Sequence, residues 1–369
     1  MILIQTDRET LLKPLQAVTG IVERRHTLPI LSNVLIERDD GALKFVATDL
    51  EIQVTTTTSG EGKDARPLAV TVAAKKLQDI LRALPEQAGV SLESKDGRLQ
   101  LKAGKSRFSL QTLPPEDFPR LAEAGSAQAA VTLPQGVLRS LLLQVQYAMA
   151  QQDIRYYLNG LLIVLEPGSL KLVATDGHRL AFVNHALQEV AGRQEVILPR
   201  KAVLELVKLL ADSDEPVRLE VLANQVRFSF DTVVLVSKVI DGKFPDYARV
   251  VPASYGRHFL MDRITLQQAL QRTSILSNEK FRGVRLVMTS GSLRVSCTNT
   301  DQEEAQEELE IDYSGEALDI GFNVTYLLDV LNNLSAEHVD CAFGDANSSA
   351  LITVPGDADF RYVVMPMRI

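Results

Sequence analysis

The sequence has little cysteine, no tryptophan and few histidines, and these shortages exclude several classes of protein. Its 369 residues include two cysteines, Cys297 and Cys341, and five scattered histidines. Two cysteines cannot make a disulfide framework, and both lie in alternating apolar stretches, so we expect buried, reduced thiols. The histidines offer no metal-ligand spacing. The sequence therefore predicts a protein that needs no metal and no other cofactor.

Long apolar runs and an excess of positive charge are also absent. Asp7, Arg8 and Glu9 interrupt the apolar start Met1 to Gln5, so we expect neither a signal peptide nor a membrane span there, and a cytoplasmic location. The net charge is −8 at pH 7. An acidic chain is a poor starting point for a protein that touches phosphate, unless its positive charges are gathered in one place.

A repeat of about 125 residues organises the chain. The segment 43–49 (LKFVATD) returns at 170–176 (LKLVATD) and, more faintly, at 293–299 (LRVSCTN). A segment with apolar residues at i, i+3, i+4 and i+7, typical of an amphipathic helix, follows each copy at a similar distance, at 75–84, 200–210 and 324–334. The chain therefore contains three copies of one unit.

Within each copy the pattern runs helix, strands, helix, strands, which predicts an α+β fold. The runs 98–111 and 233–239 alternate like strands, and Pro14 should kink or delay the first helix. Segments 122–130 and 251–257 have the composition of linkers. We therefore predict three domains, at 1–124, 128–250 and 257–369.

Positive charge is concentrated in the predicted helices. The six helical segments sum to a net +5, which leaves −13 on the rest of the chain. A positive helical layer in an acidic protein suits a nucleic-acid channel, although helices of any soluble protein carry cations on their solvated faces. No base-reading motif accompanies it, so any contact with nucleic acid should be independent of sequence.

Several longer motifs resemble one family, the bacterial DNA polymerase III β subunit or sliding clamp, over essentially the whole chain. They are 27–31 (TLPIL), 107–110 (RFSL), 153–160 (DIRYYLNG), 174–181 (ATDGHRLA), 241–247 (DGKFPDY), 275–285 (ILSNEKFRGVR), 320–324 (IGFNV) and 362–368 (YVVMPMR). The resemblance implies a non-catalytic processivity factor, a head-to-tail homodimer whose six clamp domains close a ring around duplex DNA. Helices would line the inside, antiparallel sheets the outside, and the protein would be associated with the nucleoid.

The resemblance also implies residues that contact DNA. These are Arg25, Gln152, Tyr157, Arg200 and Lys201. Helix position and charge add Lys75, Lys76 and Arg82, and the unusual Arg24 beside Arg25 either contacts DNA or is solvated.

A second implied site is an apolar pocket that receives short linear motifs of DNA polymerases, the clamp loader and repair proteins. Methionines would let such a pocket adapt to several partners. Asn347 stands near its second compartment, where the family often has an apolar residue. The implied pocket residues are Leu158, Thr175, Gly177, His178, Arg179, Leu180, Pro245, Arg249, Val250, Val363, Met365 and Met367.

A third implied site is the dimer interface. A cationic edge with two apolar anchors would meet an acidic stretch of the other subunit, 301–308, and two apolar residues beside it. From the residues alone, the aromatic and leucine anchors could equally be core residues and the acidic run a solvated face. The implied interface residues are Lys105, Arg107, Phe108, Leu110, Ile275, Leu276, Glu303, Glu304 and Glu307.

Two other classes of function remain as alternatives. Asp176 and His178 could serve a hydrolase as a carboxylate and a general base, but no nucleophile motif or phosphate-binding loop accompanies them. The second alternative is a peptide-binding scaffold that does not bind DNA. It would differ from a sliding clamp only in that its basic helices have no nucleic-acid partner.

Overall fold

The computed structural model describes residues 2–23, 28–39, 42–59, 68–122, 125–187 and 192–369. Arg24 and Arg25, predicted to contact DNA, lie outside these residues. The chain divides into two compact units, Met1–Arg139 with Leu204–Val239, and Ser140–Val203 with Ile240–Ile369. None of the helices in the described ranges has the length and apolar character needed to cross a membrane.

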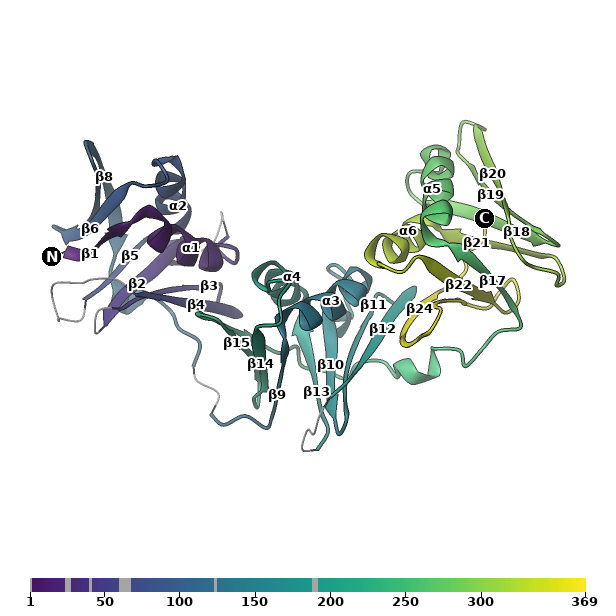
Figure 1. Cartoon of the computed structure of the whole chain (residues 1–369), viewed down its shortest axis with the longest axis horizontal. Helices are drawn as coiled ribbons and strands as arrows, with labels where there is room; N and C mark the ends of the chain where they lie inside the picture. Colours follow the sequence, from purple (N-terminus) through teal and green to yellow (C-terminus); the bar gives the residue numbers. More distant parts are fainter. Residues whose placement is uncertain (1, 24–27, 40–41, 60–67, 123–124, 188–191) are drawn as a thin grey trace. The chain divides into compact units, whose positions relative to one another are not determined.

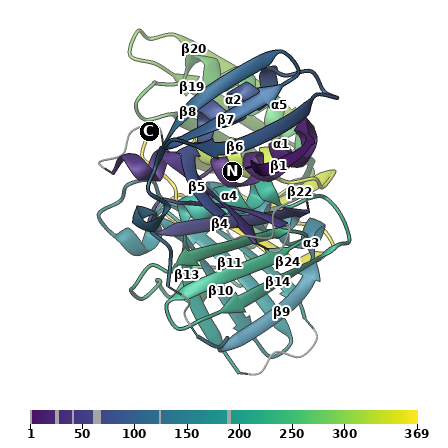
Figure 2. The same ribbon diagram turned by 90° about the vertical axis from the view of Figure 1, so that its left-hand side faces the viewer.

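The first unit contains a twelve-stranded antiparallel sheet in the order β1-β6-β7-β8-β5-β2-β3-β4-β16-β15-β14-β9. Helices α1 (Arg8–Thr19) and α2 (Ala74–Ala83) pack against each other (Figure 1), and β9 lies beside β14 at the end of the sheet (Figure 2). The strands are β1 (Ile2–Asp7), β2 (Asn33–Asp39), β3 (Ala42–Thr48), β4 (Ile52–Ser59), β5 (Leu68–Ala73), β6 (Gly89–Lys95), β7 (Arg98–Ala103), β8 (Ser106–Leu113), β9 (Ala129–Pro134), β14 (Pro216–Val221), β15 (Gln225–Phe230) and β16 (Val233–Lys238).

The second unit contains an eight-stranded sheet, β13-β10-β11-β12-β24-β23-β22-β17, and a four-stranded sheet, β20-β19-β18-β21, both antiparallel. Helices α5 (Arg263–Thr273) and α6 (Val324–Asn333) pack together, and α3 (Gln135–Val145) and α4 (Arg200–Leu209) cross the border between the units. The strands are β10 (Gly160–Glu166), β11 (Ser169–Thr175), β12 (Arg179–Ala186), β13 (Gln194–Pro199), β17 (Arg257–Asp262), β18 (Gly283–Thr289), β19 (Ser292–Thr298), β20 (Glu304–Glu310), β21 (Leu318–Asn323), β22 (His338–Phe343), β23 (Ala350–Val354) and β24 (Asp357–Val364).

The order of elements repeats three times, as strand, helix, four strands, helix and three strands. This confirms the α+β fold and the internal repeat. Strands also pair from one repeat to the next, β4 with β16 and β12 with β24. Because sheets continue across the repeats, the two compact units do not coincide with the three predicted domains, whose limits remain a prediction.

Equivalent side chains fix the helix ends in the first and third repeats. The carboxylates of Asp7 and Asp262 accept hydrogen bonds from the backbone N–H groups of Thr10 and Thr265 and cap α1 and α5. The next residue, Arg8 or Arg263, donates to a carbonyl in the last turn of the second helix of its repeat, from Nε to Leu81 O at 2.7 Å or from Nη1 to Leu331 O at 2.8 Å. One arginine thus joins the two helices of each of these repeats.

Two local predictions need correction. Pro14 does not delay the first helix, since Asp7 caps it and α1 begins at Arg8 and continues past the proline. The run 98–111 is two strands, β7 and β8, separated by a turn that includes Gly104 at φ 56°. The left-handed conformation of that glycine reverses the chain direction.

Both cysteines are free and buried. Burial raises the pKa of Cys297 to about 11 and that of Cys341 to about 12, because the thiolate is costly without solvent. They are unreactive core side chains, as predicted.

Candidate functional site

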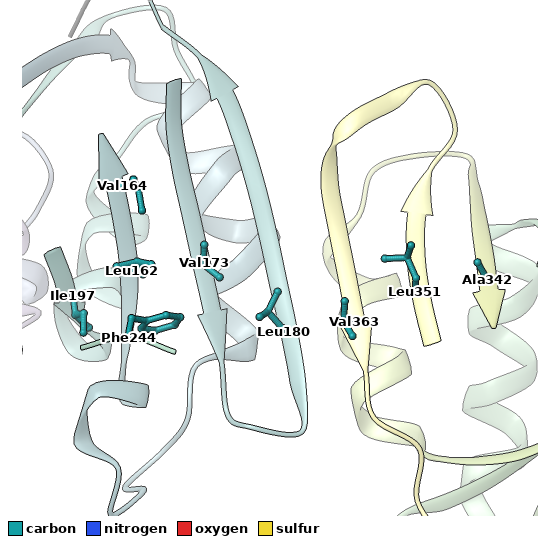
Figure 3. Close-up of a cluster of buried hydrophobic side chains, with 9 residues drawn as sticks. All are labelled: Leu162, Val164, Val173, Leu180, Ile197, Phe244, Ala342, Leu351 and Val363. Carbon is teal, nitrogen blue, oxygen red and sulfur yellow. The ribbon is translucent and has the colours of Figure 1, made fainter. Parts of the chain in front are cut away.

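An apolar cluster occupies one face of the eight-stranded sheet where the second repeat meets the third (Figure 3). At its centre Leu180 of β12 pairs with Val363 of β24, and both are buried. Because side chains alternate along a strand, Leu180 and Phe182 point to this face while Ala181 points to the other. The other buried members are Leu162, Val164, Val173, Ile197, Phe244, Ala342 and Leu351.

The predicted pocket residues differ in burial. Leu158, Thr175, Leu180 and Val363 are buried, and Leu180 and Val363 belong to the cluster and form the floor of the predicted pocket. The others are half-buried or exposed, and a bound chain could reach the exposed ones. The half-buried members are Arg179 and Met367, and the exposed ones are Gly177, His178, Pro245, Arg249, Val250 and Met365.

The structure brings these segments together through specific contacts. The N–H of Met365 donates to the carbonyl of His178 at 2.8 Å, which ties the C-terminal segment to the loop between β11 and β12. The ring of Tyr247 stacks on Phe182 with centroids 5.9 Å apart, which brings the segment around Arg249 to the same sheet face. The site therefore draws on three separate parts of the second unit.

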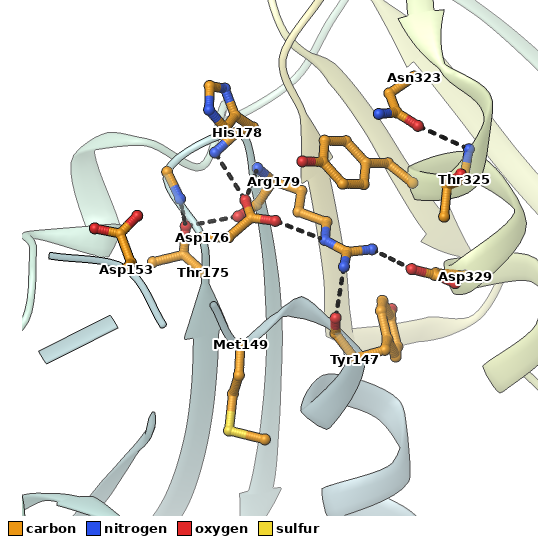
Figure 4. Close-up of polar contacts among 12 residues, drawn as sticks. Tyr147, Met149, Asp153, Thr175, Asp176, His178, Arg179, Asn323, Thr325 and Asp329 are labelled. Carbon is orange, nitrogen blue, oxygen red and sulfur yellow. Dashed lines mark hydrogen bonds and ion pairs between the residues drawn. The ribbon is translucent and has the colours of Figure 1, made fainter. Parts of the chain in front are cut away.

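The loop 175–179 is held by its own hydrogen bonds (Figure 4). Oδ1 of Asp176 accepts from the backbone N–H groups of His178 at 2.9 Å and Arg179 at 3.1 Å. The hydroxyl of Thr175 donates to the carbonyl of Arg179 at 2.6 Å and accepts from the N–H of Gly177 at 3.1 Å. These bonds close a tight turn that presents the exposed His178.

Gly177 is required in this turn. Its φ is 90°, and a Cβ there would lie 2.9 Å from Nη1 of Arg155. Arg155 is 44% exposed, forms an ion pair with Asp153 at 2.8 Å and donates to the carbonyl of Asp176 at 3.1 Å. Hydrogen bonds from Arg155 lower the pKa of Asp153 to about 2. Arg155 is not among the predicted pocket residues, but these contacts place it beside the pocket loop.

A cavity of about 420 Å³ lies beside the apolar cluster, on the side of the third repeat. Tyr255, Ala342 and Leu351 belong to both the cavity wall and the cluster. None of the twelve predicted pocket residues lines this cavity. Asn347 is exposed in a turn where its N–H donates to Oδ1 of Asp345.

The predicted DNA-contacting residues fall into different environments. On α2, Lys76 and Arg82 are exposed and Lys75 is half-buried. The half-buried guanidinium of Arg200 donates to the carbonyl of Met149 at 3.3 Å, and burial lowers its pKa. These positions leave the cations of α2 the more accessible to phosphate.

Two further predicted contacts lie in the loop before β10. Gln152 is exposed at a φ of 55°. Tyr157 packs against the apolar cluster of the pocket. The remaining predicted contact, Lys201, is outside this loop and is half-buried at the start of α4.

The predicted interface residues lie on two strand edges and one short helix. On β8, Arg107 is exposed and Phe108 and Leu110 are half-buried, with Lys105 exposed in the turn before it. Ile275 is 77% exposed and Leu276 half-buried. So large an exposed apolar side chain is typical of an interaction surface.

The acidic partner stretch is partly neutralised within its own chain. Arg272 donates to the carboxylate of Glu307 at 2.7 Å, which lowers the pKa of Glu307. Glu303 and Glu304 are exposed on the edge strand β20 and the turn before it. These two glutamates are therefore the better candidates to meet a cationic partner.

Family models match the chain in three consecutive parts. The N-terminal, central and C-terminal domains of the DNA polymerase III beta subunit match residues 2–122, 132–246 and 248–368. The chain belongs to the DNA polymerase III beta subunit family. Its three repeats are the three clamp domains of that family, and the chain is a non-catalytic subunit of the polymerase.

Relatives and solved structures of this family match over the full length. The beta sliding clamp of Pseudomonas putida is 46% identical over 363 residues, 98% of each chain. The crystal structure of the DNA polymerase III subunit beta from Pseudomonas aeruginosa superposes with a TM-score of 0.96 at 45% identity over 100% of both chains. A sliding clamp of the same organism bound to griselimycin gives a TM-score of 0.95 at 44% identity, again over 100% of both chains.

In this DNA polymerase III beta subunit, the contacts of Asp176 do not support the hydrolase hypothesis. Both oxygens of the Asp176 carboxylate are engaged by the loop, Oδ1 by two backbone N–H groups and Oδ2 by Arg179 at 3.1 Å. Asp176 is thus a turn residue rather than a partner of the His178 imidazole.

Proposed function

We propose that this chain is a DNA sliding clamp, of which two copies join head to tail into a closed ring around duplex DNA. The ring tethers DNA polymerases to their template and also receives the clamp loader and repair proteins. It acts in the cytoplasm, on the nucleoid, and holds DNA by enclosure rather than by catalysis or sequence recognition.

The pattern of strand pairing between repeats carries this proposal. In the pairs β4 with β16 and β12 with β24, the end strand of one repeat's set of four strands lies beside the end strand of a neighbouring repeat's set. By position in the repeat, β20 is the equivalent of β4 and β12, and β8 is the equivalent of β16 and β24. If the same strand pairing continued from one chain to another, β20 of one copy would pair with β8 of the next.

Both of these edges are open in the single chain. Among the described residues β20 pairs only with β19, and β8 pairs along its length with β7 but with β5 only at Leu113 and Thr112. Unpaired strand edges are templates for another chain. A contact between two different surfaces must close into a ring or grow into a filament, and family membership supports closure by two copies.

The chemistry of the two edges is complementary. Arg107 and Lys105 supply cations at β8, whereas Glu303 and Glu304 supply carboxylates at β20. Phe108 and Leu110 on one side and the exposed Ile275 on the other supply apolar area. Each apolar side chain that becomes fully buried contributes roughly 1.5–3 kcal/mol, and opposite charges select the correct partner.

Enclosure of DNA within a ring explains how a polymerase is tethered better than the affinity of the protein for DNA does. Non-specific phosphate contacts alone give dissociation constants of about 10⁻⁴ to 10⁻⁶ M and weaken steeply with salt. The exposed Lys76 and Arg82 suit such weak, mobile contacts. A ring that holds DNA topologically needs only these.

The apolar cluster and the exposed residues above it suit short linear motifs. A motif with apolar side chains would cover the floor around Leu180 and Val363, while His178 and Arg249 offer polar contacts at the rim. Met365 and Met367 can adapt to different side chains. One site could therefore serve several partners in turn.

Small-angle scattering with negative-stain imaging of the purified protein, without DNA, tests the ring. We expect a closed annulus of twice the 40.6 kDa chain mass with a central hole. A compact monomer, or an open filament, would contradict the proposal.

A further inference from the structure

The side chain of Arg179 points away from the surface that a partner peptide would occupy. It is 9% exposed. Its Nε donates to Oδ2 of Asp176 at 3.1 Å, its Nη2 donates to the carbonyl of Tyr147 at 2.6 Å, and its Nη1 forms an ion pair with Asp329 (Figure 4). Every nitrogen of the guanidinium thus has a partner within the chain.

Two aromatic rings flank this guanidinium. Its central carbon lies 4.4 Å from the ring centroid of Tyr326 and 5.7 Å from that of Tyr147. Contacts of a cation with ring faces strengthen when water is excluded. The hydroxyl of Tyr362 donates to the carbonyl of Tyr326 at 2.9 Å, which adds β24 to the same assembly. Arg179 is therefore fixed on every side.

The partners of Arg179 come from separate parts of the second unit. Asp176 belongs to the pocket loop, Tyr147 to the segment after α3, and Asp329 and Tyr326 to α6 of the third repeat. One guanidinium therefore connects the loop of the second repeat to a helix of the third.

Asp176 transmits this connection to the pocket. One of its oxygens holds the guanidinium, and the other holds the N–H groups of His178 and Arg179. If the guanidinium moves, the carboxylate turns and the loop that presents His178 loses its anchor. Displacing a positioned group by a small distance is enough to weaken a binding site.

We infer that Arg179 is a positioning residue that locks the pocket loop against helix α6 through Asp176 and Asp329, rather than a residue that itself contacts the partner peptide. This inference rests on the proposed function of the pocket. It assigns roles in peptide binding to Asp329 and Tyr326, which lie outside the predicted pocket. It also makes binding depend on how α6 and the loop are joined.

The test replaces Asp329 by asparagine, a change of charge with little change of volume, and measures the affinity for a fluorescein-labelled peptide carrying the clamp-binding motif of a replicative polymerase. We expect the D329N protein to bind this peptide about tenfold more weakly, as is usual for coupling between sites. The D329E protein, which keeps the carboxylate, should bind more tightly than D329N. The matched control is D340N, because Asp340 is similarly exposed (33% against 30%) and also contacts a side-chain nitrogen, Nδ1 of His258 at 3.2 Å, but lies outside the network.

A double-mutant cycle separates positioning from general loss of stability. If Asp329 acts by placing His178, the D329N change should cost little affinity in a protein that already carries H178A. Full additivity of the two changes, or unchanged peptide affinity in D329N, would overturn the inference. Melting temperatures of all variants check that the fold is retained.

Amide hydrogen exchange tests the same inference without any peptide. In D329N the amides of His178 and Arg179 should exchange faster than in the parent protein, while those of β10 stay protected. Equal protection of the loop in both proteins would overturn the inference. Failure of the parent protein to bind the peptide would instead contradict the proposed function, and the exchange result would still decide the role of Arg179.

Discussion

Asp262 illustrates how single side chains set the helix ends of this protein. Its carboxylate accepts the N–H of Thr265 at 2.6 Å and also the hydroxyl of that threonine. The following Arg263 then reaches the carbonyls of Leu331 and Ala336. Because Asp7 and Arg8 do the same in the first repeat, the capping pair recurs in two of the three repeats.

Removing the cap of α5 should lower stability. In the Asp262→Ala protein the first turn of the helix loses its acceptor, and we expect unfolding at a lower urea concentration than in the parent protein. Asp262→Asn keeps an acceptor and should lose less. Urea unfolding at neutral pH measures both, and equal losses would argue against a capping role.

The same cap predicts a dependence on pH. Hydrogen bonds from the hydroxyl and the N–H of Thr265 lower the pKa of Asp262 below its usual 3.8. A lowered pKa in the folded state means that the stabilisation is complete above pH 3.8 and disappears as the pH falls through the folded value. The difference in the free energy of unfolding between the parent and Asp262→Ala proteins should therefore become smaller only in acid. A difference that becomes larger in acid would contradict this account of the cap.

At the scale of elements, the open edges of β8 and β20 would decide how two copies associate in the proposed dimer. Both edges carry charged side chains, which oppose pairing with an unrelated edge. The same features favour one partner, because the cations of one edge match the carboxylates of the other.

Charge reversal tests that match. The Lys105→Glu/Arg107→Glu protein should dissociate at concentrations where the parent is a dimer, with a dissociation constant raised by at least about tenfold, because like charges would oppose each other. Adding Glu303→Lys and Glu304→Lys to the same chain should restore much of the dimer. Lys95→Glu/Arg98→Glu reverses two exposed cations of the neighbouring hairpin and is the matched control. Sedimentation equilibrium gives the masses. A dimer that is unaffected by reversing the cations of β8, with or without reversal of the two glutamates, would exclude this interface.

Periodic features of the sequence predicted the elements well, and single contacts between distant segments were not predictable. The spacing of Leu77, Leu81 and their equivalents gave the helices because one helix face must be buried. Nothing local indicates that the side chain of Arg179 turns toward Asp329, 150 positions along the chain. The same holds for Arg272, whose neutralisation of Glu307 depends on the packing of α5 near β20.

At the scale of the whole molecule, repetition gives the protein its function. Three copies of one unit, joined by one kind of strand pairing, leave complementary edges for a second copy. Charge follows the same division, with a net positive set of helices in a chain of net charge −8. An assembly of this kind can hold DNA without recognising it, provided that it closes.

Retention on DNA of different topology tests this account most directly. The protein is loaded by a clamp loader with ATP onto nicked circular DNA, half of the sample is cut once to make it linear, and both halves are passed over a sizing column in high salt. Because salt removes phosphate contacts but cannot open a ring, the account predicts that the protein stays with the circular DNA and is lost from the linear DNA. Equal loss from both would contradict encirclement.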